Sequence, residues 1–531
     1  MRRASFVALA LFVPLAMRLG LDPGITIDDS LQRTYGDALV RWYRSGFVDS
    51  SALTFHNLYL YGGLFDLPAQ WLVSLDILPW DTFAARHALS ALVAVLGVWA
   101  TWFTAARIAG PRAGALAALM LALTPAWLGH GLFNSKDIPF GAAAAVVMYA
   151  SVRIVMRRPP LTWRDAVWAG VALGLALGVR SGGMFMLGYP LVAAGLRLCV
   201  DAWRPTRRSR PWRGLPQDAL CAFGRLVCVL PLTWLIMLSA WPWAQLKPFT
   251  RPFEAAAIAA HFKWRGRMRF DGAVLREHEL PWNYLPTWFR VTLPDLYALA
   301  LACGIVVLLV AALRRKFDGP RMAAVALLLM FVLAPIAGVV VTHPIIYDAH
   351  RHFLFLIPPL AALAGVALQR FLFLPQIEVA LRAGVAVFAL YLAGQTFYDM
   401  WTLHPYEYVY FNRASGGLAK QASRFETDYW GAAYREGFEW VVRNYDPGGT
   451  ERVTIATCGF DRNFGYYRGL WHAKRFVLET DRRGAQLYIS MTRNDCHHAR
   501  KGDVLHVVER QGVPLLYVYR VDPAASPKRR R

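Results

Sequence analysis

Residues 322–341 read MAAVALLLMFVLAPIAGVVV, a stretch of twenty residues without a charged side chain. A helix of about 20 apolar residues is long enough to cross the hydrocarbon core of a lipid bilayer. Because this stretch is apolar on every face, it offers no polar side to the water around a soluble domain. The sequence therefore predicts a transmembrane helix here.

The same pattern recurs along the chain and predicts a polytopic α-helical membrane protein. Of the 531 residues, 56% are hydrophobic and 18% are charged, and the mean hydropathy is +0.32. Soluble domains carry about 25% charged residues, so this composition excludes a disordered or fibrous protein. We predict eleven spans, at 4–20, 84–106, 113–131, 138–156, 163–179, 182–198, 219–240, 294–313, 322–341, 352–370 and 379–398.

Two apolar segments near the N-terminus allow more than one interpretation. Residues 4–20 follow two arginines, as in a signal peptide, but no A-x-A-like cleavage site follows them. We interpret this segment as an uncleaved anchor. Residues 58–76 are interrupted by Asp66, Pro68 and Gln70. We predict that this second segment lies on the membrane surface.

The distribution of positive charge sets the orientation of the spans. The chain has 58 Lys and Arg against 35 Asp and Glu, a net charge of +23, which by itself is compatible with nucleic-acid binding. However, 20 of the basic residues fall in short segments that alternate between the spans, and such basic loops stay in the cytoplasm. We therefore expect membrane lipids, not nucleic acid, around this charge. The segments placed inside are 1–3, 107–112, 153–164, 197–213, 314–321 and 370–382.

This orientation places two long loops and the C-terminal region on the outer side. The loops, 21–83 and the tryptophan-rich 241–293, belong to a transmembrane domain of residues 1–398. Residues 399–531 read as a small α/β domain that ends in a basic segment, 523–531. Its expected elements are a helix at 431–444, strands at 452–457, 475–479 and 486–491, and a hairpin of 504–509 with 514–521 around Gln511–Gly512.

The C-terminal region contains two cysteines, Cys458 and Cys496, and they are the only cysteines on the outer side in this topology. Disulfide bonds form and persist in oxidising compartments. Because both residues follow predicted strands, we predict that they pair.

Asp28 and Asp29 form an acidic pair just after the first span, in the sequence TIDDS. Two adjacent carboxylates at a membrane surface repel each other and need cations, a metal ion or water around them. One interpretation is a catalytic base or an acceptor-binding pair. The other is a helix cap, in which Asp29 stabilises the N-terminus of the amphipathic stretch 30–46.

Three further outer turns bring charged side chains next to the membrane. Lys136 and Asp137 lie in a tight turn, where Asp137 is either a second acidic group of the same cavity or a cap, and Lys136 either a site residue or a headgroup contact. Arg180 and Arg351 lie at span ends, where a cation is costly unless it pairs with an anion or snorkels to the interface. A guanidinium fork matches the geometry of phosphate.

Taken together, these residues resemble the membrane glycosyltransferases of the GT-C fold that use polyprenyl-phosphate sugars. The nearest groups in this resemblance are the protein O-mannosyltransferases (glycosyltransferase family 39) and the lipid A aminoarabinose transferases. An acidic pair opens the first outer loop in that family, as Asp28-Asp29 does here. The other similar motifs are FAARHALS at 83–90, GPRA at 110–113, LTP at 123–125, SKD at 135–137, RHFL at 351–354, PP at 358–359, HPY at 404–406 and DYWG at 428–431.

The resemblance implies an inverting glycosyl transfer at the periplasmic face of the bacterial inner membrane. The donor would be a sugar on undecaprenyl phosphate, and the acceptor a lipid, a glycan or a protein. In this interpretation Asp28 and Asp29 are catalytic, and Asp137 and His56 bind the acceptor or the sugar. The phosphate of the donor would be bound by Lys136, Arg180 and Arg351. No metal ligands are assigned, and a divalent cation stays open as a cofactor.

Two other functions are compatible with a polytopic chain. A secondary transporter would show internal repeats and charges near the middle of its spans, whereas the candidate charges here lie at the outer ends. An O-antigen polymerase or ligase, also a lipid-linked transferase, would depend on a large outer loop late in the chain. The acidic pair in the first loop favours the glycosyltransferase.

The alternation of basic loops predicts which parts of the chain face the cytoplasm. A reporter fused after residue 440 should be active only as a periplasmic reporter, and one inserted at residue 210 only as a cytoplasmic reporter. Activity of a periplasm-only reporter at 210 would contradict this topology.

Overall fold

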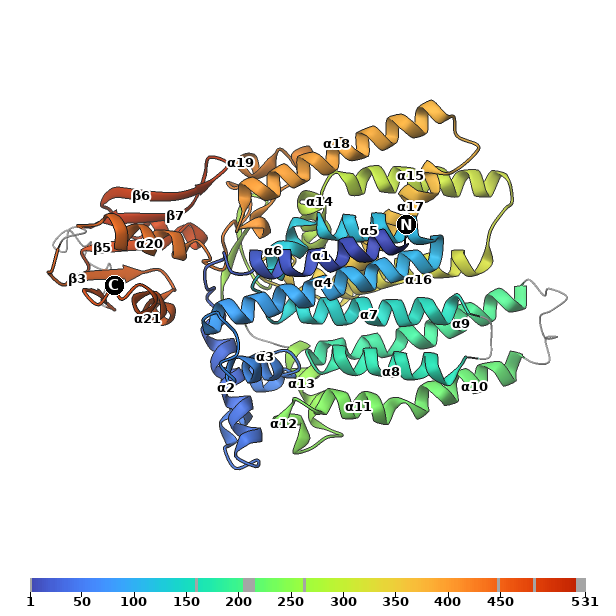
Figure 1. Ribbon diagram of the computed structural model, residues 1–531, viewed down its shortest axis with the longest axis horizontal. Helices are drawn as coiled ribbons and strands as arrows, with labels where there is room; N and C mark the ends of the chain where they lie inside the picture. Colours follow the sequence, from blue (N-terminus) through green and yellow to red (C-terminus); the bar gives the residue numbers. More distant parts are fainter. Residues whose placement is uncertain are drawn as a thin grey trace.

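The computed structural model describes residues 2–157, 161–203, 215–260, 264–446, 449–480 and 484–521. A bundle of roughly parallel and antiparallel helices occupies most of the molecule, and a small α/β unit lies at one end of it (Figure 1). Most of the predicted inside segment 197–213 and the basic end 523–531 lie outside the described residues.

The bundle follows the predicted spans closely in position. Its helices are α1 (Arg2–Leu19), α4 (Thr82–Ala109), α5 (Pro111–Ala122), α6 (Pro125–Gly131), α7 (Asp137–Val155), α8 (Trp163–Leu177), η3 (Ser181–Leu187) with α9 (Gly188–Trp203), α10 (Leu215–Cys228) with α11 (Leu230–Leu238), α15 (Leu296–Leu313), α16 (Gly319–Thr342), η5 (Arg351–Leu356) with α17 (Ile357–Leu372), and α18 (Val379–Leu403). The fold is therefore that of a polytopic helical membrane protein.

The number of spans is lower than predicted when length and hydropathy are applied to the described helices. Eight of them can cross a membrane, or nine if the bent pair α5–α6 is one span. The predicted span 163–179 corresponds to α8, whose 15 residues reach about 22 Å, short of the roughly 30 Å hydrocarbon core. The predicted span 4–20 falls on α1. The predicted span 113–131 is broken by 67° before Pro125, which cannot donate a backbone hydrogen bond.

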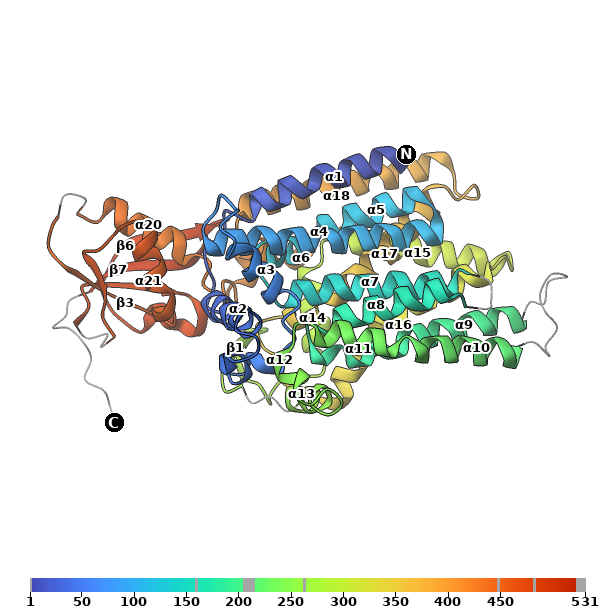
Figure 2. The same cartoon turned by 60° about the horizontal axis from the view of Figure 1, so that its bottom comes forward.

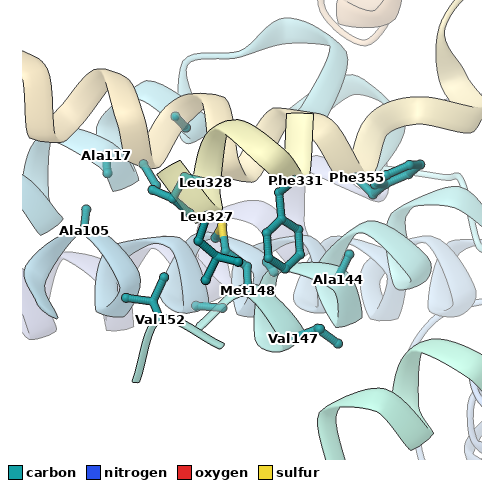
Figure 3. Packing of buried hydrophobic residues seen from close by; sticks show 14 of the residues in the cluster. Ala105, Ala117, Ala144, Val147, Met148, Val152, Leu327, Leu328, Phe331 and Phe355 are labelled. Atoms are coloured by element: carbon teal, nitrogen blue, oxygen red, sulfur yellow. The ribbon is translucent and has the colours of Figure 1, made fainter. Parts of the chain in front are cut away.

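The centre of the bundle is packed around α7. Buried side chains of α4, α5, α7, α16 and η5 interdigitate there, as Figure 3 shows for Ala105, Ala117, Met148, Phe331 and Phe355. Small residues let membrane helices approach closely, and α7 carries the run Gly141–Ala145 at this place. By contrast, only 11% of the apolar window of α18 and 17% of that of α15 is buried, so these helices offer apolar faces to lipid.

The short helices and strands of the long loops 21–83 and 241–293 lie at the end of the bundle that carries the C-terminal region (Figure 2). Residues 58–76 form no span there, because α3 is only eight residues long. The elements of this loop-rich end are α2 (Asp29–Arg44), η1 (Ser50–Leu53), η2 (Leu58–Leu60), α3 (Asp66–Val73), α12 (Pro242–Gln245), α13 (Arg251–Ala260), β1 (Arg267–Phe270), β2 (Ala273–Arg276) and α14 (Tyr284–Thr292).

The C-terminal region contains a five-stranded mixed sheet with the order β4-β3-β5-β7-β6. All five predicted strands and the predicted helix are confirmed, with α20 (Tyr434–Asn444) packed on the sheet and the hairpin turning at Gln511–Gly512. The elements are η6 (Glu407–Val409), η7 (Arg413–Ser415), α19 (Gly417–Gln421), α20, β3 (Val453–Thr457), α21 (Asp461–Leu470), β4 (Phe476–Leu478), β5 (Leu487–Met491), η9 (Arg493–His498), β6 (Asp503–Arg510) and β7 (Val513–Arg520).

One hydrophobic core joins this sheet to the bundle. It includes Phe133 from the turn before α7, Trp288 from α14, and Trp430 and Ile489 from the C-terminal region. The backbone is tied across the same boundary, since the Ile27 N–H donates to the Trp430 carbonyl oxygen at 3.0 Å. The C-terminal region is therefore packed against the loop-rich end over a shared apolar interior.

The predicted disulfide bond is confirmed. Cys458 follows β3 and Cys496 lies in η9, with their Cα atoms 6.3 Å apart. The bond links segments 38 residues apart in the sequence and holds η9 against the sheet.

Removing this bond should destabilise the C-terminal region. For Cys458→Ser together with Cys496→Ser we expect the free energy of unfolding to fall by about 2–4 kcal/mol, because the unfolded chain regains the freedom that the cross-link removes. Thermal unfolding of the purified protein with and without reductant measures this. Cys199→Ser, at an exposed free cysteine, is the control and should leave the unfolding temperature unchanged.

Candidate active site

The two carboxylates of the acidic pair differ in their surroundings. Asp29 is 6% exposed, and its Oδ2 accepts hydrogen bonds from the backbone N–H of Thr26 at 2.6 Å and from its hydroxyl at 2.9 Å. The same oxygen lies 3.3 Å from His87 Nε2 on α4. The Asp28 side chain is 34% exposed and has Lys136 Nζ at 3.8 Å. Asp29 is therefore held in place, whereas Asp28 faces open space.

Neither carboxylate caps α2 as the alternative interpretation required. Asp28 precedes the first residue of the helix, but its side chain makes no capping hydrogen bond. Asp29 turns back to Thr26 and away from the helix N–H groups. The pair is thus not explained by helix capping.

Lys136 lies between this pair and the neighbouring loop. Its side chain is 14% exposed, and its Nζ lies 5.5 Å from the centre of the Tyr61 ring. Burial is the largest single influence and lowers the pKa of Lys136, but Asp28, Tyr61 and Asp137 together outweigh it, and the pKa lies above its ordinary value. Lys136 is therefore a charged side chain turned inward, not one that only meets lipid headgroups.

Asp137 is the centre of a buried ion cluster. Its Oδ1 pairs with Arg180 Nη1 at 2.6 Å, and its Oδ2 pairs with Arg351 Nη1 at 3.1 Å. Asn134 donates to Oδ2 at 3.0 Å and accepts the Asp137 backbone N–H at 2.8 Å. The Asn134 side chain, not that of Asp137, therefore accepts the backbone N–H at the start of α7, and the Asp137 carboxylate is free to bind the two guanidinium groups.

The two arginines are not equally accessible. The Arg180 side chain is 15% exposed, and its Cζ lies 5.8 Å from the centre of the Tyr61 ring that Lys136 also faces. Arg351 is 2% exposed and lies between the rings of Tyr347 and Trp430, at 4.9 and 4.8 Å. Of the two arginines, only Arg180 therefore keeps part of its side chain exposed.

The chain of ion pairs continues beyond Arg351. Asp348 Oδ2 lies 3.1 Å from Arg351 Nη2, and Asp348 Oδ1 pairs with Arg493 Nη2 of the C-terminal region. The Trp430 indole N–H also donates to Asp348, at 3.3 Å. We call Asp28, Lys136, Asp137, Arg180, Asp348, Arg351 and Arg493 the ion cluster.

His56 lies apart from this cluster. It is exposed, between η1 and η2, with a positive φ of 48°, and its ring contacts that of Phe55. Within the described parts of the chain, no contact joins it to Asp28 or Asp137. Its assignment to acceptor or sugar binding stays a prediction.

Two small pockets meet at Lys136. One has about 200 Å³ of empty space, including its mouth, and is lined by Thr26, Asp28, Asp29, Gln32, Phe133, Asn134, Ser135, Lys136 and Trp430. The other has about 260 Å³ and is lined by Gln32, Tyr35, Leu58, Tyr61, Gly62, Phe65, Asp66, Ser135, Lys136 and Val179. The first contains the open Asp28 carboxylate together with the rings of Phe133 and Trp430, and the second contains the rings of Tyr35, Tyr61 and Phe65 together with Gln32, Asp66 and Lys136.

Sequence reasoning missed several residues that build this site. Arg86 pairs with the buried Asp66, and the adjacent His87 faces Asp29, so the start of α4 holds two acidic groups. Burial raises the pKa of Asp66 although Arg86 lowers it. An arginine and a histidine side by side at the start of an apolar span were the available signal.

No group of three or more His, Cys, Asp and Glu side chains that could hold a metal ion occurs among the described residues. Asp28 lies beside Lys136, and Asp29 contacts Thr26 and His87.

The similarity to known proteins begins at the end of α3. Residues 72–241 match the dolichyl-phosphate-mannose-protein mannosyltransferase family. These residues include α4, the Lys136–Asp137 turn and Arg180. The match confirms the resemblance to the mannosyltransferase-like GT-C enzymes and supports a glycosyltransferase-type enzyme. It fixes neither the sugar nor the acceptor.

Several solved structures resemble the chain over most of its length, at TM-scores below 0.5. ArnT from Cupriavidus metallidurans bound to undecaprenyl phosphate has a TM-score of 0.47 at 16% identity, over 98% of this chain and 99% of that one. AglB from Archaeoglobus fulgidus, in complex with an inhibitory peptide and a dolichol-phosphate, has 0.47 at 12% identity, over 91% and 69%. The arabinofuranosyltransferase AftD from Mycobacteria has 0.41 at 16% identity, over 98% and 41%. No curated protein matches the chain significantly.

The burial of Arg351 predicts a structural cost for its removal. Arg351→Ala should lower the free energy of unfolding by about 3–5 kcal/mol, because Asp137 and Asp348 each lose a partner in a buried position. Chemical unfolding of the purified protein in detergent measures this.

The matched control is Arg33→Ala, which breaks an exposed pair with Asp37 and should cost at most about 1 kcal/mol. Equal stability of Arg351→Ala and Arg33→Ala would mean that Arg351 does not form its ion pairs with Asp137 and Asp348 in the purified protein.

Proposed function

We propose that the protein is an inverting glycosyltransferase that moves a sugar from a polyprenyl-phosphate carrier to a hydroxyl group of a lipid, glycan or protein acceptor. The observation that carries the proposal is the open Asp28 carboxylate beside Lys136, next to the partly open Arg180. A base and a cationic phosphate-binding group are the two functions that this reaction needs. The family match at residues 72–241 supports a polyprenyl-phosphate donor, since that family is described by its use of dolichyl-phosphate mannose.

In the proposed reaction, Asp28 is the general base. It accepts the proton of the acceptor hydroxyl, whose oxygen forms a bond to C1 of the sugar while the bond from C1 to the phosphate oxygen breaks. Attack from the side opposite the phosphate inverts the configuration at C1. The proton ends on Asp28 and the electron pair of the broken bond on the polyprenyl phosphate. Its exposure makes Asp28 the carboxylate that an acceptor can reach.

The leaving phosphate gains negative charge as the sugar departs. Cationic donors placed where this charge develops lower the barrier. Arg180 and Lys136 are assigned to this role because both are charged, both flank Tyr61 and both keep an exposed part. Arg351 is assigned as the residue that positions Asp137, because its guanidinium is fully buried between carboxylates and rings.

We assign the two pockets to the two substrates. The acceptor would enter the pocket at Asp28, where Gln32, Asn134 and Ser135 offer hydrogen-bonding groups and Trp430 offers an apolar face. The donor would approach from the other pocket, with its sugar and phosphate near Lys136. Asp137 would contribute by orienting Arg180.

The proposal includes a location. The loop-rich end, with the C-terminal domain of residues 399–531, would face the periplasm, and the basic loops at the other end of residues 1–398 the cytoplasm of a bacterial cell. Undecaprenyl phosphate would then be the carrier lipid. The multi-pass helical bundle is the observation that supports a membrane location.

Replacing Asp28 tests the mechanism. Asp28→Asn should lower the transfer rate by about 10²–10⁴-fold, because the amide keeps the size of the side chain but cannot accept the proton. Expression and thermal stability should stay close to those of the wild type, and donor-lipid binding should not weaken. Mass spectrometry of lipids, glycans and envelope proteins from cells with and without the gene identifies the product to be followed.

Asp29→Asn is the matched variant. It should lower the rate less than Asp28→Asn, because Asp29 is buried and binds Thr26 and His87, and it should lower thermal stability more. Wild-type turnover in both variants would leave the proposed mechanism without its base. A greater loss of rate in Asp29→Asn at unchanged stability would reverse the two roles.

A further inference from the structure

The ion cluster includes one residue of the C-terminal region, Arg493. Its Nη2 pairs with Asp348 Oδ1, and its Nη1 donates to the Tyr429 carbonyl oxygen at 2.5 Å. The Arg493 side chain is 12% exposed. Asp348 is 145 residues away in the sequence and binds Arg351 with its other oxygen. Arg493 is thus one ion pair removed from the guanidinium that holds Asp137.

The segment that carries Arg493 is fixed at several points. The disulfide bond holds Cys496, the Tyr488 hydroxyl donates to the Cys496 carbonyl oxygen at 3.0 Å, and Asp495 pairs with Arg269 at 2.7 Å. Asn494 and Asp495 both have a φ of 54°, a region that L-residues visit rarely. A residue keeps such a backbone conformation only where the surrounding structure constrains it, and these conformations are enriched at functional sites.

The loop that receives Arg493 is held in the same way. Asp348 and Ala349 have φ angles of 57° and 60°. The Ala349 carbonyl oxygen accepts a hydrogen bond from the Tyr284 hydroxyl at 3.4 Å, and Trp430 donates to Asp348 at 3.3 Å. Two segments with unusual backbone, one from the bundle and one from the C-terminal region, therefore meet at a single ion pair.

The charge of the cluster depends on this pair. Without Arg493, the three cations Lys136, Arg180 and Arg351 face the three carboxylates Asp28, Asp137 and Asp348, so the net charge is zero. Arg493 brings the net charge to plus one.

A phosphate ligand needs a site with an excess of positive charge, more so when it gains charge as the sugar leaves. Two further carboxyls lie nearby: Asp495 pairs with Arg269, and Glu426, whose pKa is raised by burial, faces both Arg493 and Asp348.

We propose that Arg493 is a positioning residue that adds positive charge to the ion cluster and so sets its affinity for the phosphate of the carrier lipid. Arg493 neutralises Asp348, and Arg351 can then balance Asp137 while Arg180 keeps charge for the ligand. The C-terminal region is in this way part of the phosphate site although it does not touch the lipid. This inference rests on the proposed function.

The experiment measures binding of undecaprenyl phosphate to the purified full-length protein in detergent. Arg493→Gln should bind about tenfold more weakly, the effect of one charge over roughly 10 Å at an effective dielectric constant near 20. Arg493→Lys keeps the charge and should bind within about twofold of the wild type. The control Arg443→Gln removes a charge from the same region, at an exposed pair with Glu439, and should bind like the wild type.

A double variant separates charge from packing. Asp348→Asn with Arg493→Gln removes one charge of each sign, so the cluster returns to plus one and binding should recover to within about threefold of the wild type. A purely structural role predicts instead that the double variant and Arg493→Lys bind as weakly as Arg493→Gln, and that result overturns the inference. If Arg493→Gln alone folds poorly, the double variant and Arg493→Lys, each compared with the wild type, still test the inference.

The two proposals fail in different ways. If the wild type binds undecaprenyl phosphate and Arg493→Gln binds equally well, the role of Arg493 is wrong and the proposed function stands. If the wild type does not bind undecaprenyl phosphate at all, the proposed carrier is wrong and this inference falls with it.

Discussion

The buried carboxylate of Asp137, shared between Arg180 and Arg351, is the interaction on which the loop-rich end of the bundle depends. Taking charged groups out of water costs several kcal/mol for each ion, and this cost is offset only where geometry and further hydrogen bonds are favourable. Asp137 begins α7, Arg180 follows α8, and Arg351 begins η5. One carboxylate therefore fixes the relative position of three helical segments at the place where the site is built.

This arrangement suits the physics of a membrane protein. Helices in lipid gain little from hydrophobic burial against each other, because lipid tails are as apolar as leucine side chains. Close packing of small residues, such as Gly141–Ala145 of α7, holds the middle of the bundle. At the loop-rich end, ion pairs and the aromatic core with the C-terminal region take over. The same contacts that hold the helices thus also orient the charged groups of the candidate site.

The sequence predicts the elements better than their ends. Long apolar runs identify the spans, and alternating patterns identify all five strands of the sheet, because both periodicities are local. The length of α8 and the bend before Pro125 were not predicted, since an apolar run does not reveal where a helix stops or changes direction. Asp137, Arg180 and Arg351 could be found one by one, as charges at span ends.

The ion pairs of Asp137 with Arg180 and Arg351 could not be predicted from the sequence. The same is true of the pair between Asp348 and Arg493. Asp348 and Arg493 come together only through the fold, and each is an ordinary loop residue in the sequence. The acidic pair gives the clearest example. Asp28 and Asp29 are chemically identical neighbours, and nothing local to them says which one is open. The difference comes from Thr26 and from His87, a residue of another helix, which engage Asp29 and leave Asp28 facing Lys136. The environment that the fold supplies, not the residue type, therefore separates a held carboxylate from an accessible one.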